Sequence, residues 1–373
     1  GYSTLESNGT SYLKIDNDYV DYNSKFDLTP IEIMRITVGH EYFHGIQWGY
    51  EENLGSNAYF YEMTSMWFED VLIPDGNDYL DGWADDLLDD PTADFDNTGG
   101  GYELALFGHY LSSFLDPKGI DTAKNSTIIR EIWEEYAQGS SNQTIFQSLE
   151  NVLINSYQTS FPYVWSDFMS RNMYSGLYED MNNNIYYHEG LKLIDPPSFT
   201  YESIFENSLN TYNIAIDDDK VSFFGIDTDQ VMTASAYFSS GDYNLWSGIL
   251  YDEYELNNST GQTSFTTSFN GQSSKIFFIL SSNSADDEIS LNLSIDIQGC
   301  MDNFADNYNE FATSDDGSCS YTDSFYNLYP NPVNTETENL KLDFISSLEK
   351  TLNLSLYDLN GRFIQTLGGV DAL

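Results

Sequence analysis

Two histidines and a glutamate stand at the spacing that a metal centre requires. The segment reads His40-Glu41-Tyr42-Phe43-His44, so the histidines are four residues apart. On a helix, residues i and i+4 lie on one face, where two imidazoles can bind one Zn²⁺ and the Glu between them can reach a water on the metal. We therefore predict a zinc site at His40 and His44, with Glu41 as the general base.

A catalytic zinc needs a third protein ligand, and the next predicted helix supplies two candidates. Glu62 lies eighteen residues after His44, and Glu69 lies seven residues beyond Glu62. Either carboxylate would complete a site with three protein ligands and an open position for water. A solvent-exposed carboxylate on a helix face is the alternative interpretation of Glu62.

These residues resemble the metal motif of the gluzincin metallopeptidases, whose third ligand is a Glu on a helix about twenty residues past the second His. In the aminopeptidase branch, a small residue, an aromatic residue and an acid follow that Glu. Ser65, Trp67 and Glu69 match these types at the same offsets from Glu62. The resemblance covers about residues 10–178. It implies that Glu62 is the ligand and that Glu69 supports the site or lies on the helix face.

The same resemblance points to Tyr102 as a donor to the oxyanion. In gluzincin aminopeptidases a Tyr at the start of a later helix has this role, and Tyr102 is placed like it, forty residues past Glu62. Such a donor meets the charge that develops on the substrate carbonyl oxygen. His109, further along the same predicted helix, is the rival donor. Packing is the alternative role of both side chains.

The reaction that the resemblance implies is amide hydrolysis of a protein or peptide substrate. Zinc lowers the pKa of a bound water toward about 7 and polarises the carbonyl. Glu41 then takes a proton from the water and passes it to the leaving amine. Gluzincin aminopeptidases also carry a Gly-X-Met-Glu-Asn segment, which residues 1–35 lack, so we expect an endopeptidase. The alternative is a surface binding or adhesion protein with an inactive peptidase domain.

Helices in the first half of the chain must position these residues. Thr29 and Pro30 are favourable at a helix start, Glu32 lies in the first turn, and the apolar pattern runs to about Trp48. A strand is predicted over residues 11–16, and further helices are predicted over residues 57–72, 102–115, 126–137, 144–157 and 163–174.

Beyond about residue 200 the pattern changes to short alternating segments, for example residues 220–224, 233–238, 275–280 and 290–297. Such segments, punctuated by Gly, Asn and Asp, are typical of an antiparallel sandwich. The predicted fold class is multidomain, with a mainly helical α+β zincin-like catalytic domain followed by all-β sandwich domains. The predicted domains are 1–198 (metallopeptidase, possible truncation at its N-terminus), 199–298 (accessory β-sandwich), 299–322 (Cys-bounded module) and 325–373 (partial C-terminal domain).

The Asp- and Asn-rich residues 300–319 resemble a short module that is common in secreted bacterial multidomain proteins. A disulfide between Cys300 and Cys319 would contribute about 3 kcal/mol to stability. The Asp and Asn oxygens suit Ca²⁺, which is a hard cation. Two free thiols in a polar linker are the alternative.

The C-terminal residues resemble the sorting domain of type IX secretion cargo. Tyr329-Pro330-Asn331-Pro332 matches the turn that opens those small β-sandwiches, and residues 354–362 follow in the matching order. Because 45 residues run from Tyr329 to the end, we expect the final strands to be missing. The resemblance implies contact with the secretion machinery and export across a Gram-negative outer membrane, with release or surface attachment. An ordinary small β domain is the alternative.

Charge and hydropathy restrict the partners of this chain. It has 60 acidic and 13 basic residues, a net charge of −47, and 16% aromatic residues. Nucleic acid is excluded because phosphate contacts need clustered Lys and Arg, and the aromatic content favours folded domains over acidic disorder. No apolar run is long enough for a transmembrane helix. No signal peptide is visible, which indicates that it was removed or that the chain is a fragment.

The acidic residues are concentrated around the predicted site. No Lys or Arg occurs between Arg35 and Lys118, and nine Asp residues lie between positions 75 and 96. We interpret residues 75–96 as a solvated loop. A Ca²⁺ site and a negative substrate cleft that favours basic peptides are the alternatives.

Overall fold

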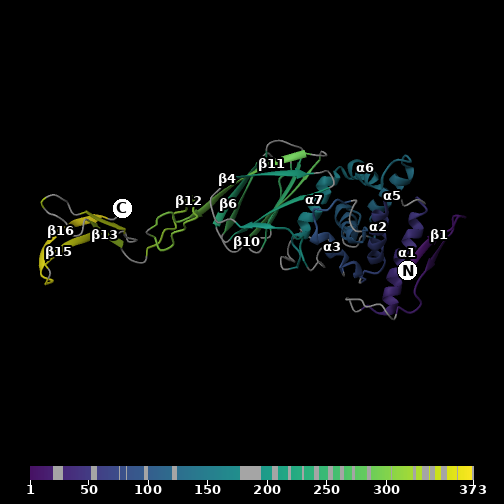
Figure 1. Cartoon of the computed structure of the whole chain (residues 1–373), viewed down its shortest axis with the longest axis horizontal. Helices are drawn as coiled ribbons and strands as arrows, with labels where there is room; N and C mark the ends of the chain where they lie inside the picture. Colours follow the sequence, from purple (N-terminus) through teal and green to yellow (C-terminus); the bar gives the residue numbers. More distant parts are fainter. Residues whose placement is uncertain are drawn as a thin grey trace.

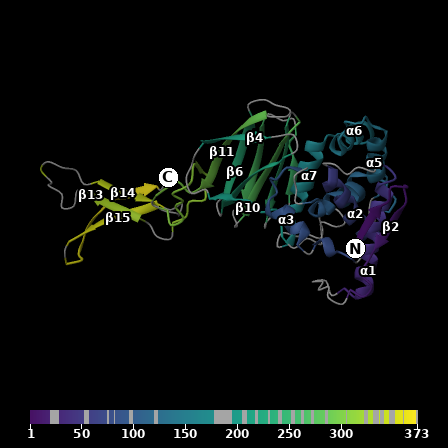
Figure 2. The same cartoon turned by 45° about the vertical axis from the view of Figure 1, so that its right-hand side comes forward.

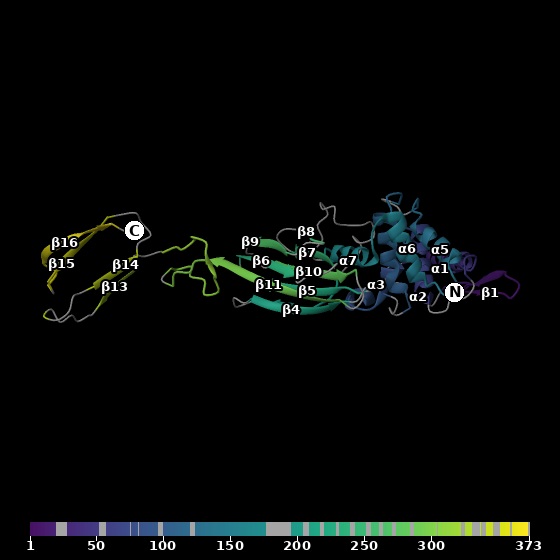
Figure 3. The same ribbon diagram turned by 90° about the horizontal axis from the view of Figure 1, so that it is seen from above.

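Three parts follow one another along the longest axis of the molecule. Figures 1 and 3 show helices around the N-terminus, then β-sheets, then hairpins near the C-terminus. This mixed α+β arrangement agrees with the multidomain organisation expected from the sequence, and the exact domain boundaries stay predictions. The computed structural model describes residues 1–19, 28–51, 57–74, 76–80, 82–95, 100–119, 124–176, 195–203, 209–216, 220–228, 231–238, 243–250, 255–260, 264–270, 274–283, 287–303, 305–321, 325–329, 336, 341–345, 351–358 and 360–371.

The helices predicted from apolar periodicity are confirmed in position. Within the described residues, none of them is both long and apolar enough to cross a membrane. Their bounds are α1 Pro30–Gln47, α2 Ala58–Leu72, η2 Asp78–Leu80, α3 Trp83–Asp89, η4 Tyr102–Leu104, α4 Ala105–Tyr110, η5 Leu111–Leu115, α5 Ile128–Gln138, α6 Ile145–Tyr157 and α7 Phe161–Asn172.

The metal motif lies on α1, which packs against α2. Glu32 accepts hydrogen bonds from the backbone N–H and the hydroxyl of Thr29, at 2.8 and 2.6 Å, and so stabilises the start of α1. The predicted N-terminal strand is confirmed as β2 (Ser11–Lys14), which pairs with β1 (Tyr2–Leu5). This hairpin lies beside α1 in Figure 2.

The helix predicted over residues 102–115 is confirmed in extent but is not one regular α-helix. It begins as the 3₁₀ turn η4, continues as α4 and ends as the π-helical η5. The hydroxyl of Ser113 donates to the carbonyl of His109 at 2.6 Å, which competes with the regular backbone ladder. Trp67 of α2 donates to the hydroxyl of Ser112 at 2.8 Å, so contacts with α2 hold this irregular end.

The prediction that residues 75–96 form a solvated loop was wrong. The described part of this segment contains η2 and α3. Ala84, Leu87 and Leu88 are buried, whereas Asp85 and Asp86 are exposed, so α3 is an amphipathic helix. The many Asp residues obscured an apolar face at helical spacing, which is why the sequence suggested a loop.

Two five-stranded sheets follow the helices and confirm the predicted strands. The first has the order β3-β5-β10-β7-β8, and the second has the order β12-β11-β6-β9 with β4 also paired to β11. All pairs are antiparallel except β3–β5 and β11–β12. The bounds are β3 Tyr201–Ser203, β4 Leu209–Ile216, β5 Ser222–Thr228, β6 Val231–Phe238, β7 Tyr243–Leu250, β8 Glu255–Asn258, β9 Ser264–Asn270, β10 Ser274–Ser282, β11 Asp287–Gly299 and β12 Ser314–Asp315.

One apolar core extends from the helices onto the first sheet. α7 packs against β7 and β10, as Figure 3 shows. Trp165 of α7 is fully buried, with Phe95, Phe107 and Phe168 at ring-centroid distances of 5.0 to 5.2 Å. The same cluster of buried side chains includes Phe277 of β10. The helices and this sheet therefore stabilise each other.

The last part contains the disulfide and two hairpins. Cys300 and Cys319 are joined, with their Cα atoms 4.7 Å apart, which confirms the predicted bridge and excludes two free thiols. Pro330, Asn331 and Pro332 of the predicted sorting-domain turn lie outside the described residues. The hairpin strands are β13 Phe325–Tyr329, β14 Lys341–Ile345, β15 Thr351–Tyr357 and β16 Phe363–Asp371.

The aromatic core supplies a test of the packing. Replacing Trp165 with Ala removes a fully buried indole and should lower the free energy of unfolding by about 3–5 kcal/mol. Chemical denaturation monitored by circular dichroism measures this loss. The control Ile154→Ala changes an exposed side chain and should stay within about 0.5 kcal/mol of the wild type. Equal stability of the two variants would contradict the shared core.

Candidate metal centre

Three side chains predicted as metal ligands come together in the structure. His40 Nε2 lies 3.1 Å from His44 Nε2 and 3.1 Å from Glu62 Oε2, and His44 Nε2 lies 3.4 Å from Glu62 Oε2. Donor atoms about 2.0–2.1 Å from a tetrahedral zinc lie roughly 3.3 Å from each other. The three side chains therefore form a group that could hold a metal ion.

The other ring nitrogen of each histidine faces a hydrogen-bond acceptor. His40 Nδ1 lies 2.5 Å from Glu69 Oε1, and His44 Nδ1 lies 2.7 Å from Gln47 Oε1. Each Nδ1–H can donate to its acceptor, which leaves the lone pair of Nε2 directed at the shared point. This support from outside the ligands is characteristic of histidines that bind metals. The arrangement fits zinc on the chemistry of its donors.

Gln47 is a residue of the site that the sequence analysis missed. Its side chain is fully buried, and its amide donates to the carbonyl of Tyr61 at 2.8 Å and to the hydroxyl of Thr64 at 2.9 Å. Gln47 therefore fixes the ring of His44 relative to α2. The available signal was its position three residues after His44, on the same face of the helix.

Hydrogen bonds determine the protonation of two of the predicted ligands. Burial lowers the pKa of His40, but hydrogen bonds with Glu62 and Glu69 outweigh it and raise that pKa to about 10. Burial raises the pKa of Glu62, but hydrogen bonds with His40 and His44 bring it down to about 2. Glu62 is therefore ionised and favours a positive charge beside it, which is a proton on His40 or, in place of that proton, a metal ion.

Tyr102 lies next to this group because of Gly101. Gly101 has a φ of 98°, and a Cβ atom there would come within 1.9 Å of the carbonyl oxygen of Tyr59, so only glycine fits. Tyr59 lies on α2 one turn before Glu62, which brings Tyr102 to the ligands. The Tyr102 ring stacks on that of His40, with centroids 6.0 Å apart and planes 13° apart.

The electrostatic surroundings of Tyr102 reflect its position beside Glu62, Glu41 and Glu69. Burial raises the pKa of its hydroxyl, and the nearby charges of Glu62, Glu41 and Glu69 raise it further. The hydroxyl therefore keeps its proton and can donate a hydrogen bond. Glu41 itself is buried and follows His40 on α1.

The two remaining candidates occupy different places. Glu69 contacts Nδ1 of His40, on the opposite side of the ring from the shared point, and is not among the three convergent donors. His109 is buried on α4, with Nε2 4.0 Å from Asp70 Oδ2 and its ring stacked on Tyr79 at 5.2 Å. Its role at the oxyanion stays a prediction.

The acidic segments show no second metal centre in the described part of the chain. There, only His40, His44 and Glu62 bring together three suitable His, Cys, Asp or Glu donor atoms. Positions 75, 81 and 96–99 lie outside the described residues. Lys220 reaches Asp94 at 2.6 Å, so a base from the sheet region offsets part of this charge. Calcium binding at residues 75–96 or 300–319 stays a prediction.

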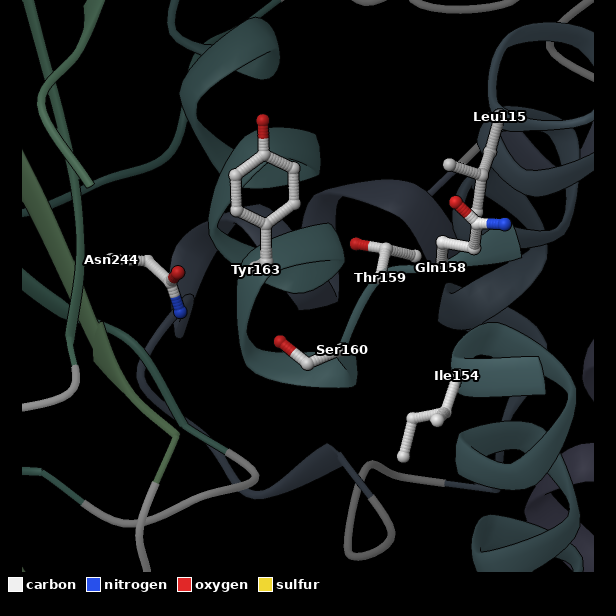
Figure 4. A pocket seen from close by; sticks show the side chains of 7 residues that line it. All are labelled: Leu115, Ile154, Gln158, Thr159, Ser160, Tyr163 and Asn244. Atoms are coloured by element: carbon white, nitrogen blue, oxygen red, sulfur yellow. The ribbon is translucent and has the colours of Figure 1, made fainter. Parts of the chain in front are cut away.

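A cavity of about 710 Å³ lies away from the metal centre, where the start of α7 meets β7. Figure 4 shows its side chains, which are neutral and include none of the predicted site residues. The cavity is therefore not the site predicted from the sequence. Its lining consists of Leu115, Ile154, Gln158, Thr159, Ser160, Tyr163 and Asn244.

Comparisons with known proteins leave the family open. No protein-family model and no curated protein match the chain. It is similar to PliG, a periplasmic inhibitor of g-type lysozyme, from Salmonella Typhimurium (10% identity, TM-score 0.21, 26% of this chain and 99% of that chain). It is also similar to PliG from Aeromonas hydrophila (9% identity, TM-score 0.21, 26% of this chain and 96% of that chain). A third similarity is to the pre-peptidase C-terminal domain of a Bacillus anthracis collagenase (13% identity, TM-score 0.20, 26% of this chain and 98% of that chain). TM-scores this low support no inference.

The support of His40 by Glu69 can be tested through metal affinity. Glu69→Gln keeps the size of the side chain but removes the negative charge behind the imidazole. We expect zinc affinity to fall about 10-fold or more, measured by competition with a chromophoric chelator. Glu134→Gln, on the exposed face of α5, is the matched control and should bind zinc as the wild type does. Unchanged affinity in Glu69→Gln would show that the carboxylate does not support the ligand.

Proposed function

We propose that the chain is a zinc-dependent metallopeptidase of gluzincin type, and that it cleaves peptide bonds as an endopeptidase. The observation that carries this proposal is the convergence of His40 Nε2, His44 Nε2 and Glu62 Oε2 within 3.4 Å of each other. Both histidines come from one turn of α1, and the carboxylate comes from α2. Two imidazoles and one carboxylate are the ligand set of many catalytic zinc sites.

When bound, zinc supplies Lewis acidity, which polarises the substrate carbonyl and activates a water molecule for attack. Glu41 is the base of the reaction, because it lies between the two histidines in the sequence and is buried beside them. Its carboxylate accepts a proton from the attacking water and delivers it to the amine of the leaving group. Burial of Glu41 keeps bulk water from competing for that proton.

Tyr102 is the donor that stabilises the oxyanion. Its ring lies on the ring of His40, and its hydroxyl stays protonated because burial, and then the charges of Glu62 and Glu41, raise its pKa. A donor held in place before the reaction costs no reorganisation when charge develops on the carbonyl oxygen. The fixed position of Gly101 against α2 supplies this rigidity.

The remaining parts fit an exported enzyme. In this proposal the helical part is a zincin-like catalytic domain, and the two five-stranded sheets form an accessory β-sandwich. A disulfide such as Cys300–Cys319 persists in oxidising compartments. The C-terminal hairpins belong to a sorting domain that contacts the type IX secretion machinery. The enzyme would then act on protein or peptide substrates outside a Gram-negative cell or at its surface.

The decisive experiment uses Glu41→Gln. This variant keeps His40, His44 and Glu62, so we expect one equivalent of zinc, as in the wild type. Without a base, hydrolysis of a peptide library should fall at least about 100-fold. Elemental analysis gives the metal content, and mass spectrometry of the digest gives the activity.

The controls separate the peptidase from a binding protein. Glu134→Gln should retain full activity, and chelation of zinc from the wild type should abolish it. A wild type that holds zinc but cleaves no member of the library would favour the surface binding or adhesion protein. A zinc-loaded Glu41→Gln protein that cleaves at the wild-type rate would show that Glu41 is not the base.

The role of Tyr102 is tested by Tyr102→Phe. Phenylalanine keeps the ring against His40 and removes only the hydroxyl. We expect kcat to fall about 100- to 1,000-fold, with zinc content and KM near those of the wild type. Steady-state kinetics on one library peptide measures both parameters. If kcat is unchanged, the oxyanion donor must be another group, for which His109 is the remaining candidate.

A further inference from the structure

An exposed tryptophan stands at the edge of the metal centre. Trp83 begins α3 and is 43% exposed, whereas Ala84, Leu87 and Leu88 of the same helix are buried. The indole of Trp83 is therefore not part of the buried apolar face of α3. A large aromatic side chain left open to solvent beside a candidate active site is available to a ligand.

Ring stacking ties Trp83 to the proposed catalytic group. The indole stacks on the ring of Tyr102, with centroids 4.9 Å apart and planes 30° apart. Tyr102 stacks in turn on His40, at 6.0 Å and 13°. The three rings form a series that leads from a metal ligand outward. One indole face covers Tyr102, so its solvent-exposed area lies away from that contact.

The charged residues next to Trp83 in the sequence are acidic. Asp85 and Asp86 follow it on the exposed side of α3, and Asp86 is three residues on, which places it on the same side of the helix as Trp83. The sequence has no Lys or Arg between Arg35 and Lys118. An indole face attracts cations through its quadrupole, and nearby carboxylates add to that attraction.

We propose that Trp83 forms a specificity-determining subsite that accepts a Lys or Arg side chain of the peptide substrate. This inference rests on the proposed peptidase function and names the substrate class of the same site. The cation lies on the exposed part of the indole, and Asp86 adds charge attraction. An uncharged side chain of equal length gains only apolar contact there.

The distances agree with a residue near the scissile bond. The two centroid separations, 6.0 and 4.9 Å, place the indole within about three residues of extended peptide from His40, at roughly 3.3 Å per residue. A Lys or Arg side chain itself reaches several ångströms from its backbone, so the residue that contacts Trp83 can lie closer to the cleaved bond than this distance suggests. The subsite therefore takes a residue one to three positions from the cleaved bond.

The test compares matched peptides that differ only in one residue near the cleaved bond, with Arg, Lys, norleucine or Gln at that position. For the wild type we expect kcat/KM to be about 5- to 30-fold higher with Arg or Lys than with the neutral residues. Trp83→Leu should reduce this ratio to about 2 or less, and Trp83→Phe should retain an intermediate ratio. Asp86→Asn should lower the ratio about 2-fold.

Tyr308→Ala is the matched control, because Tyr308 is 45% exposed and lies in the disulfide-closed segment. It should leave the ratio unchanged. Equal loss of kcat/KM for all peptides in Trp83→Leu would overturn the inference, since it would mean that Trp83 only positions Tyr102. A wild type that cleaves all peptides equally would overturn it as well and leave the peptidase function intact.

Binding separates failure of this inference from failure of the proposed function. Zinc-loaded Glu41→Gln is titrated with the same peptides by fluorescence anisotropy. Tighter binding of Arg or Lys peptides, lost in the double variant with Trp83→Leu, supports the subsite even if the wild type hydrolyses nothing. Equal binding of charged and neutral peptides by Glu41→Gln would overturn the subsite.

Discussion

The site depends on the antiparallel packing of α1 against α2. Gly39 permits close approach, because a Cβ there would lie 3.1 Å from the side chain of Leu72. At the other end of the contact, the buried amide of Gln47 bonds to Tyr61 and Thr64 of α2. Between these points His40 and His44 face Glu62. Neither helix alone contains three convergent donors, so the metal group exists only where the two helices meet.

Burial of carboxylates is the energetic cost of this arrangement. Glu41 and Glu69 are buried and Glu62 is partly buried, and an uncompensated buried charge is strongly unfavourable. Hydrogen bonds to the histidines offset part of this cost, which is why the pKa of His40 rises and that of Glu62 falls. Because no Lys or Arg lies between Arg35 and Lys118, a bound cation is the natural counter-charge. The excess of acidic residues that gives the chain its net charge of −47 is thus also found at the proposed active site.

Local spacing predicted the two histidines of the site, and long-range contacts determined the positions of the other side chains. The His-Glu-X-X-His spacing and the apolar periods predicted α1, α2, His40 and His44, whereas the choice of Glu62 over Glu69 rested on the resemblance to the gluzincins. The place of Tyr102 needed the contact between Gly101 and the backbone of α2, which no local pattern reveals. Gln47 was missed because its function arises only from burial between two helices. α3 was missed because Asp occupies three of its seven positions, which obscured a short apolar face.

The irregular helix over residues 102–115 connects the metal centre to the aromatic core. Its first turn holds Tyr102 against His40, and its middle places Phe107 against Trp165 of α7. α7 in turn packs on β7 and β10, so the first sheet supports the helix that carries the proposed oxyanion donor. Gly108 brings this helix close to Trp67 of α2, where a Cβ would lie 3.0 Å from the Trp67 side chain. The sheet region therefore supports the site, because it packs against α7, which in turn contacts the helix that carries Tyr102.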